Sequence, residues 1–180
     1  MKKVVIISSS LRASSNSQML AREFERGAKD SGNDVQFISL RDKKIAFCRG
    51  CLACQAKRDG HCVIRDDADE ITQAMLTADV IAFATPIYYY EMSGQLKTML
   101  DRANPIFCMD YRFRDIYLFT TAADDAPETP QKAMSGIEGW ISCFENARLA
   151  GTVFAGGVNA PNEISGHPAL EKAYIMGKSI

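Results

Sequence analysis

The chain has 180 residues, 47% of them hydrophobic, which is enough apolar material for the core of one compact domain spanning residues 1–180. Its 21 basic and 22 acidic residues give a formal net charge of −1, so no broad positive field is available to bind nucleic acid or an anionic membrane surface. The apolar run at residues 4–7 is too short for a signal peptide or a membrane span, and we expect a cytoplasmic protein.

Five apolar segments along the chain are predicted to be strands. They span residues 3–8, 34–40, 78–84, 115–121 and 149–155. Amphipathic patterns predict helices over about 17–29, 66–77, 93–103 and 129–146, and a short C-terminal helix from about 168. This alternation predicts an α/β three-layer sandwich whose five parallel strands lie in the order 2-1-3-4-5. Ligands of such a sheet bind at the carboxyl ends of the strands, beside the loops after strands one and three.

A polar loop, Ser8–Ser17, joins the first strand to the first helix. The N-terminus of a helix offers free backbone N–H groups and the positive end of its dipole, which suit a phosphate. The loop has neither the Gly-x-x-x-x-Gly-Lys pattern of triphosphate sites nor the Gly-x-Gly-x-x-Gly pattern of dinucleotide sites. A plain solvated turn would need only one helix-capping residue. The side chains expected to bind the phosphate are those of Ser10, Arg12, Ser15, Asn16 and Ser17.

An aromatic loop, Thr85–Ser93, leaves the third strand at the same edge of the sheet. Three adjacent tyrosines are unfavourable in water, so we expect them to pack on a flat surface such as the isoalloxazine ring of a flavin. A plain hydrophobic loop or a subunit interface is the alternative. Residues after the fourth strand would border the ring from its other side. The residues expected at the ring are Pro86, Ile87, Tyr88, Tyr89, Thr120, Thr121 and Ala122.

Four of the six cysteines fall within one long polar stretch, with the spacing Cys-x2-Cys-x2-Cys-x7-Cys. Clustered cysteines in a cytosolic protein indicate metal or redox chemistry more than disulfides. Thiolates at these short spacings can bind a four-iron cluster; a four-cysteine zinc site and ordinary free thiols are the alternatives. The predicted metal ligands are Cys48, Cys51, Cys54 and Cys62.

The remaining reactive side chains are predicted to be structural. Cys108 and Cys143 lie in apolar surroundings and are expected to be small core residues. His61 is expected to face outward from its loop, and Lys97 and Arg102 are expected to be structural charges of a helix.

Several motifs occur in the order found in a known family. Ser-x-Arg-x-x-x-Asn-Ser follows the first strand, Cys-x-Gly-Cys-x-x-Cys precedes Gly-His-Cys-Val-Ile-Arg-Asp-Asp, and Ala-Thr-Pro-Ile-Tyr-Tyr precedes Met-Ser-Gly-Gln-Leu-Lys and Asp-Arg. Over residues 1 to about 160 the chain therefore resembles the NAD(P)H-dependent FMN reductases, and among them the iron–sulfur flavoproteins. Ser9, where such loops often carry glycine, and the short C-terminal helix depart from the family pattern.

The resemblance implies a flavodoxin-like fold, bound FMN, a 4Fe–4S cluster on the four clustered cysteines, and a homodimer or homotetramer. For FMN binding it implies Ser10, Arg12, Asn16, Ser17 and the loop 86–89.

The function expected from this resemblance is hydride transfer from NAD(P)H to FMN, followed by reduction of a quinone, a flavin or another acceptor. The flavin performs this chemistry, so no side chain is predicted to be catalytic. NAD(P)H is expected to bind only transiently, and no nucleic acid or membrane partner is expected. One alternative is an electron-transfer carrier that passes single electrons from ferredoxin-like donors through the cluster to FMN. Another is a flavin-free regulatory or structural domain.

Overall fold

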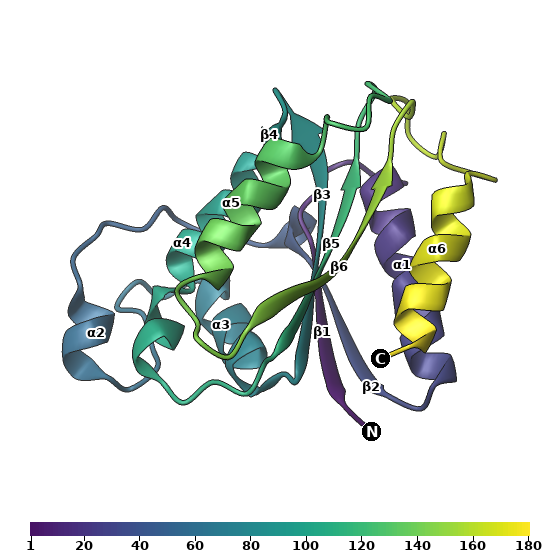
Figure 1. Ribbon diagram of the computed structural model, residues 1–180. Coiled ribbons are helices and arrows are strands. Elements are labelled where there is room, and N and C mark those ends of the chain that lie inside the picture. The colour runs from purple at the N-terminus through teal and green to yellow at the C-terminus, as the bar shows by residue number, and fades with distance from the viewer.

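A parallel sheet runs through the middle of the protein in the computed structural model, which describes residues 1–180. Five parallel strands lie in the order β2-β1-β3-β5-β6, and a short strand, β4, pairs antiparallel with β3 (Figure 1). The strands are β1 Lys3–Ser8, β2 Asp34–Ser39, β3 Val80–Tyr88, β4 Glu91–Met92, β5 Asp115–Thr121 and β6 Arg148–Ala155. The predicted order of the five parallel strands is confirmed, and β4 is a sixth strand that the sequence did not reveal.

Helices cover both faces of the sheet. α1 and α6 lie side by side on one face, and α3, α4 and α5 cover the other (Figure 1). The α-helices are α1 Asn16–Asp30, α2 Ala53–Lys57, α3 Asp67–Thr77, α4 Gly94–Arg102, α5 Gln131–Ile141 and α6 Pro168–Lys178, and the 3-10 helices are η1 Leu40–Asp42 and η2 Asn104–Cys108. The predicted three-layer α/β architecture is therefore confirmed. None of the helices combines the length and the hydrophobicity that a membrane span requires.

The central strand β1 is buried on both faces, and its side chains alternate between two cores. Val4 and Ile6 join the core under α1 and α6, while Val5 and Ile7 join the core under α3, α4 and α5. In the first core the ring of Phe24 packs against two aromatic rings of β5 at centroid distances of 5.1 and 4.9 Å. These two cores hold β1 rigidly, and β1 in turn fixes the loop that follows Ser8.

The two helices α1 and α6 approach so closely that glycine is required on both. A Cβ on Gly177 would collide with the carbonyl oxygen of Phe24, and a Cβ on Gly27 would collide with that of Tyr174. Backbone-to-backbone packing of this kind fixes the position of α6 against α1, which begins at the loop Ser8–Ser17, named the phosphate loop here after its predicted ligand.

Two sequence predictions about element bounds and one about the burial of cysteines are wrong. The third strand does not end at residue 84 but continues through Pro86 to Tyr88. The predicted helix 129–146 is shorter, because α5 begins at Gln131 and ends at Ile141. Cys143 is exposed instead of lying in the core, because it follows the end of α5 in a turn, and Cys108 is only partly buried at the end of η2.

Candidate functional site

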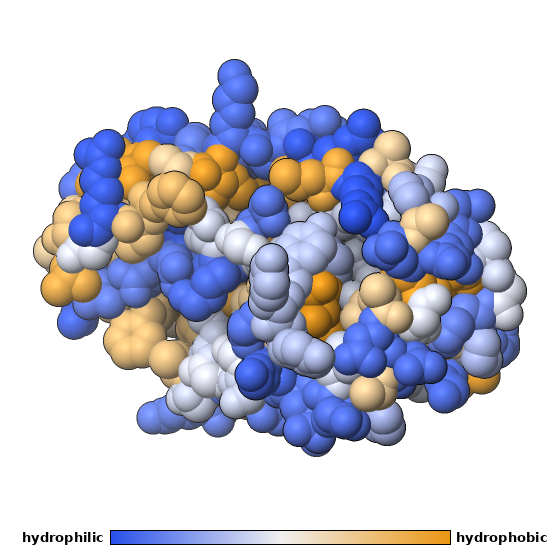
Figure 2. All heavy atoms as spheres, turned by 90° about the horizontal axis from the view of Figure 1, so that it is seen from above, coloured by the Kyte–Doolittle hydropathy of each residue, from blue (hydrophilic) through white to orange (hydrophobic).

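A cavity of about 230 Å³ opens at the carboxyl ends of β1, β3 and β5. This end of the sheet faces the viewer in Figure 2, where hydrophobic patches lie among hydrophilic residues. The cavity is lined by Ser10, Arg12, Ser15, Asn16, Pro86, Ile87, Tyr88, Thr121, Val158, Asn159 and Pro161. Four of the residues expected from the sequence to bind FMN do not line this cavity: Ser17, Tyr89, Thr120 and Ala122. The structure thus places most of the predicted phosphate and ring residues around one hollow.

The loop after β1 forms the N-terminal cap of α1. The Ser15 hydroxyl accepts a hydrogen bond from the backbone N–H of Gln18 at 3.4 Å and lies 3.1 Å from the Ser17 hydroxyl. Both serines are buried. The first N–H groups of a helix have no partner within the helix, so this end of α1 carries partial positive charge beside the cavity.

Two of the predicted phosphate donors hold a distant loop. Arg12 donates from Nη1 to the carbonyl of Asn159 at 2.7 Å, and Asn16 donates from Nδ2 to the carbonyl of Ala160 at 2.9 Å. The Oδ1 of Asn16 also accepts from the N–H of Ile164 at 3.2 Å. Asn16 therefore uses both ends of its amide to fix the loop after β6 over the phosphate loop.

The carboxylate of Glu163 shapes the same loop after β6. It accepts the backbone N–H groups of Asn159 and Ala160 at 2.6 and 2.7 Å, and these hydrogen bonds lower the pKa of Glu163. Sequence reasoning missed Val158, Asn159 and Pro161 as cavity residues. The only local signal was the Gly156-Gly157 turn, because the contacts that bring this loop to the site join residues far apart in the chain.

The aromatic loop is a β-hairpin. Ile87 pairs with Met92 and Tyr88 with Glu91, so Tyr89 and Tyr90 form a two-residue turn with φ of 52° and 67°. The Tyr89 side chain is 99% exposed at the tip, whereas Tyr88 lines the cavity. Tyr89 therefore packs on no surface of its own chain, and its packing on a flavin ring or a second subunit stays a prediction.

Ser9 occupies the position where loops of this kind often carry glycine, and its side chain makes contacts that glycine could not. Its buried hydroxyl donates to the carbonyl of Ala84 at 3.1 Å and lies 2.8 Å from the hydroxyl of Ser93, which caps α4. A glycine at this position could not connect β1, β3 and α4 in this way. The serine fixes the loops after β1 and β3 relative to each other.

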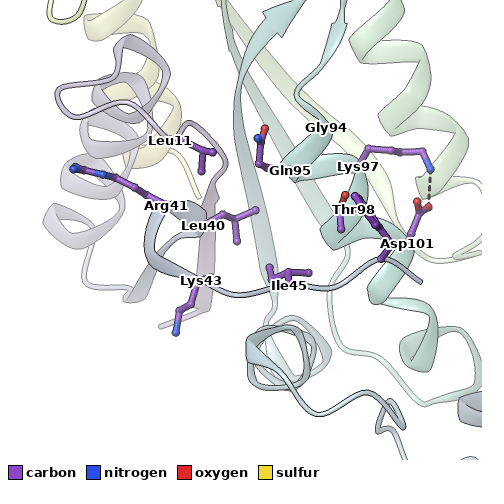
Figure 3. Close-up of a pocket in the computed structure, with 11 residues that line it drawn as sticks. Leu11, Leu40, Arg41, Lys43, Ile45, Gly94, Gln95, Lys97, Thr98 and Asp101 are labelled. Atoms are coloured by element: carbon purple, nitrogen blue, oxygen red, sulfur yellow. Dashed lines mark hydrogen bonds and ion pairs between the residues drawn. The ribbon is translucent and has the colours of Figure 1, made fainter. Parts of the chain in front are cut away.

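A larger groove of about 640 Å³ lies on the other side of the phosphate loop. Figure 3 shows that its walls come from three segments: Leu11 of the phosphate loop, the stretch from Leu40 to Ile45, and α4. Lys97 and Asp101 of α4 form an exposed ion pair at 2.6 Å, and the structural role expected of Lys97 stays a prediction. Phe47, also at the groove, is 79% exposed. Sequence reasoning did not reveal this groove.

All four clustered cysteines line one small cavity of about 20 Å³. Cys54 is buried, Cys62 is partly buried, and Cys48 and Cys51 are exposed; all four are free thiols. The side-chain amide of Asn104 donates to the sulfur of Cys54 at 3.2 Å, and the N–H of Gly50 donates to that of Cys48 at 3.4 Å. No group of three or more Cys, His, Asp or Glu side chains is arranged to hold a metal ion.

These surroundings fit a cluster in their chemistry but not in their present volume. Four thiols, N–H donors to sulfur and a buried cation, Arg102, are what a negatively charged iron–sulfur cluster needs. A cavity of about 20 Å³ has room for one water molecule, so a four-iron cluster would need a wider cavity than this one. His61, beside this cavity, lies 2.9 Å from Asp69 through its Nδ1.

Comparisons with known proteins agree with this architecture. An iron–sulfur flavoprotein of Methanocaldococcus jannaschii is 41% identical over 104 residues, which is 58% of this chain and 53% of that protein. One from Archaeoglobus fulgidus is 37% identical over 105 residues, covering 58% of this chain and 46% of that protein. This chain thus spans about half the length of the curated relatives that it matches.

Solved structures show the same fold. The crystal structure of an azoreductase from Bacillus anthracis matches with a TM-score of 0.74 and 16% identity over 100% of both chains. An NAD(P)H:quinone oxidoreductase from Methanothermobacter marburgensis matches with a TM-score of 0.72 and 13% identity, over 99% of this chain and 96% of that one. The sequence pattern of the NADPH-dependent FMN reductases matches residues 2–124. The chain therefore belongs to the NADPH-dependent FMN reductase family.

Proposed function

We propose that this protein is an FMN-dependent oxidoreductase that passes electrons from NAD(P)H through bound FMN to a quinone, a flavin or another acceptor. The observation that carries the proposal is the cavity at the carboxyl ends of β1 and β3, where the N-terminus of α1 meets the hairpin after β3. Ligands of doubly wound sheets bind where the strand order reverses, and this cavity lies there.

The phosphate of FMN would bind at the start of α1. The first N–H groups of the helix and the hydroxyls of Ser10 and Ser15 are the proposed donors, and Ser17, which does not line the cavity, would act through its contact with the Ser15 hydroxyl. One N–H of Arg12 donates to the carbonyl of Asn159, and the other N–H groups of the guanidinium can donate to the phosphate. Asn16 is proposed to act mainly by fixing the loop after β6, since both ends of its amide are already bonded.

The flavin ring would lie against Pro86, Ile87 and Tyr88 on one side and Thr121 on the other. When bound, FMN supplies a centre that accepts a hydride and releases electrons. Arg12 and Tyr88 are the ionisable side chains of the cavity, and it contains no carboxylate, lysine or histidine. We therefore propose that the protein binds and orients the reactants and assign no side chain as a general acid or base.

A cluster-containing carrier is the second candidate function, and the shared cavity of the four cysteines favours it. In this form Cys48, Cys51, Cys54 and Cys62 would hold a 4Fe–4S cluster, which would exchange single electrons with ferredoxin-like donors. The relatives from M. jannaschii and A. fulgidus carry the name iron–sulfur flavoprotein.

We further propose that residues 1–180 form one domain and that the protein is a homodimer or homotetramer. The groove in Figure 3 combines the apolar side chains of Leu11, Leu40 and Ile45 with the exposed ring of Phe47. A second copy of the chain is the proposed occupant, because exposed apolar residues beside a groove are typical of association surfaces.

Anaerobic stopped-flow spectroscopy tests the two candidate functions. The FMN-loaded protein is mixed with NADPH, with NADH and with reduced ferredoxin, while flavin absorbance is followed. An oxidoreductase is bleached by at least one nicotinamide and reoxidised by a quinone. Bleaching by reduced ferredoxin alone would support the carrier, and a protein that remains colourless after FMN is added would contradict both.

A further inference from the structure

Arg102 is a fully buried cation at the cavity of the four cysteines. It is the last residue of α4, and its side chain has no solvent exposure. Its two terminal nitrogens hold the carboxylate of Asp66 at 2.6 and 2.9 Å. The same nitrogens donate to the carbonyls of Ala46 at 2.8 Å and Ile64 at 3.2 Å. Arg102 thus fixes both ends of the cysteine-containing segment to α4.

The third nitrogen of this guanidinium, Nε, is buried without any hydrogen-bond partner. An unpaired buried donor is unusual, because it has lost its hydrogen bonds to water and gained none in return. The four cysteines line the cavity that Arg102 also lines, so their sulfurs are the candidate acceptors. Burial lowers the pKa of Arg102, but the hydrogen bonds and the charge of Asp66 raise it above its ordinary value.

Other polar groups at this cavity do not match these properties. Arg49 also lines this cavity, but Arg49 is exposed to solvent. Asn104 already donates to Cys54, and Asp101 can only accept hydrogen bonds when ionised. Arg102 is therefore the one buried, charged donor with a free N–H at the cysteines.

We propose that Arg102 is a positioning residue whose Nε–H donates to a cysteine sulfur of a cluster held by Cys48, Cys51, Cys54 and Cys62. The inference rests on the proposed cluster. Hydrogen bonds to sulfur and nearby positive charge stabilise the reduced, more negative state of an iron–sulfur cluster. Arg102 would therefore raise the reduction potential of this cluster, and the same side chain holds both ends of the segment that carries the ligands.

The test uses the full-length protein with FMN bound, reconstituted anaerobically with iron and sulfide. The two variants are Arg102→Lys, which keeps the charge but has no Nε, and Arg49→Lys, a matched change at the exposed arginine of the same cavity. The readouts are iron content, the midpoint potential of the cluster EPR signal, and ¹⁵N hyperfine coupling in protein grown on ¹⁵N-arginine.

The proposal predicts that Arg102→Lys retains iron, loses the ¹⁵N coupling and is about tenfold harder to reduce, which is about 59 mV for one electron. Arg49→Lys should keep both the coupling and the potential of the wild type. An unchanged potential in iron-loaded Arg102→Lys would overturn the role of Arg102 alone. If Arg102→Lys fails to fold, the ¹⁵N coupling of Arg49→Lys decides. A coupling that is kept supports Arg102 as its source, and a coupling that is lost assigns the signal to Arg49 and overturns the proposal.

The cluster itself is tested by the wild-type control. A wild type that takes up no iron overturns both the cluster and the role of Arg102. The FMN oxidoreductase would be judged separately, by bleaching with NAD(P)H.

Discussion

Asn16 joins the start of α1 to the loop after β6 through both ends of its side chain. It donates to Ala160 and accepts from Ile164, and this second loop contributes Asn159 and Pro161 to the proposed FMN cavity. One side chain therefore positions residues from two widely separated parts of the chain. Its effect on a ligand would be indirect, through the shape of the cavity.

Replacing Asn16 with alanine removes both hydrogen bonds and releases the loop after β6. We expect FMN to bind about tenfold more weakly, a loss of about 1.4 kcal/mol. Titration of flavin fluorescence quenching measures this affinity. The control is Gln18→Ala in the same helix turn, which should bind FMN as the wild type does. Equal affinities of Asn16→Ala and wild type would show that the loop does not shape the site.

Asp79 is an acidic residue that connects three segments near the start of the sheet. It accepts the backbone N–H of Lys3 at 2.8 Å and the guanidinium of Arg112 at 2.7 Å. The hydrogen bond from Lys3 lowers the pKa of Asp79, burial opposes this, and Arg112 lowers the pKa further. Because the folded-state pKa lies below that of the unfolded chain, the stabilisation is complete above the unfolded value, about 3.9, and is lost as pH falls through the folded pKa.

The variant Asp79→Asn should lower the free energy of unfolding at pH 7 by about 1–2 kcal/mol. The difference from wild type should shrink as the pH is lowered toward 3, because the wild-type carboxylate then becomes protonated. Urea denaturation of both proteins at several pH values measures this difference in the free energy of unfolding. Asp101→Asn, which breaks the exposed pair with Lys97, should change stability by less than about 0.5 kcal/mol. A pH-independent difference at Asp79 would contradict this assignment.

At the scale of secondary-structure elements, long and strongly patterned segments could be predicted from sequence. The buried run of β1 and the periodic face of α1, with Leu20, Phe24 and Ala28 all fully buried, have clear signals. The extension of β3 through Pro86 does not, because proline normally ends a strand. Here β1 pairs with β3 only as far as Ala84, so Pro86 no longer needs to donate a hydrogen bond on that side.

The hairpin and the site loops show why other features could not be predicted. Tyr89 and Tyr90 occupy a turn that usually contains glycine or asparagine, so the sequence carries no turn signal there. The serines of the phosphate loop were recognisable because one local segment holds them all. The loop after β6 joins the cavity only through contacts with Arg12 and Asn16, and such long-range contacts leave no local pattern.

The contact between α1 and α6 makes a prediction about packing. Gly177→Ala would place a methyl group against the carbonyl of Phe24, and backbone cannot move aside as a flexible side chain can. We expect a loss of about 3 kcal/mol in the free energy of unfolding. Gly139→Ala in α5, where an added Cβ meets nothing within 4 Å, should instead stabilise by about 0.5–1 kcal/mol. Thermal and urea unfolding of both variants measures these opposite signs, and a neutral Gly177→Ala would contradict the close packing.

At the scale of the whole molecule, the groove shown in Figure 3 is proposed to be covered by a second copy. Phe47→Asp places a charge at this surface without touching the core, because Phe47 is largely exposed. We expect the variant to be monomeric at concentrations where the wild type is a dimer or tetramer, as measured by light scattering after size-exclusion chromatography. Phe107→Asp, at an exposed site away from this groove, should keep the wild-type mass. A wild type that is itself monomeric would contradict the proposed assembly.

The anchoring of the cysteine-containing segment has a consequence for how the protein would mature. Arg102 and Asp66 hold the segment at residues 46 and 64–66, while the stretch between these points has few contacts with the two cores. Within that stretch Cys54 is bonded to Asn104, and Gly60 and Cys62 are bonded to α3, so the exposed residues 47–51 are the part that can change shape. If the proposed cluster is bound, we therefore expect it to be inserted after the sheet has folded, into a protein that is already native in its remaining parts.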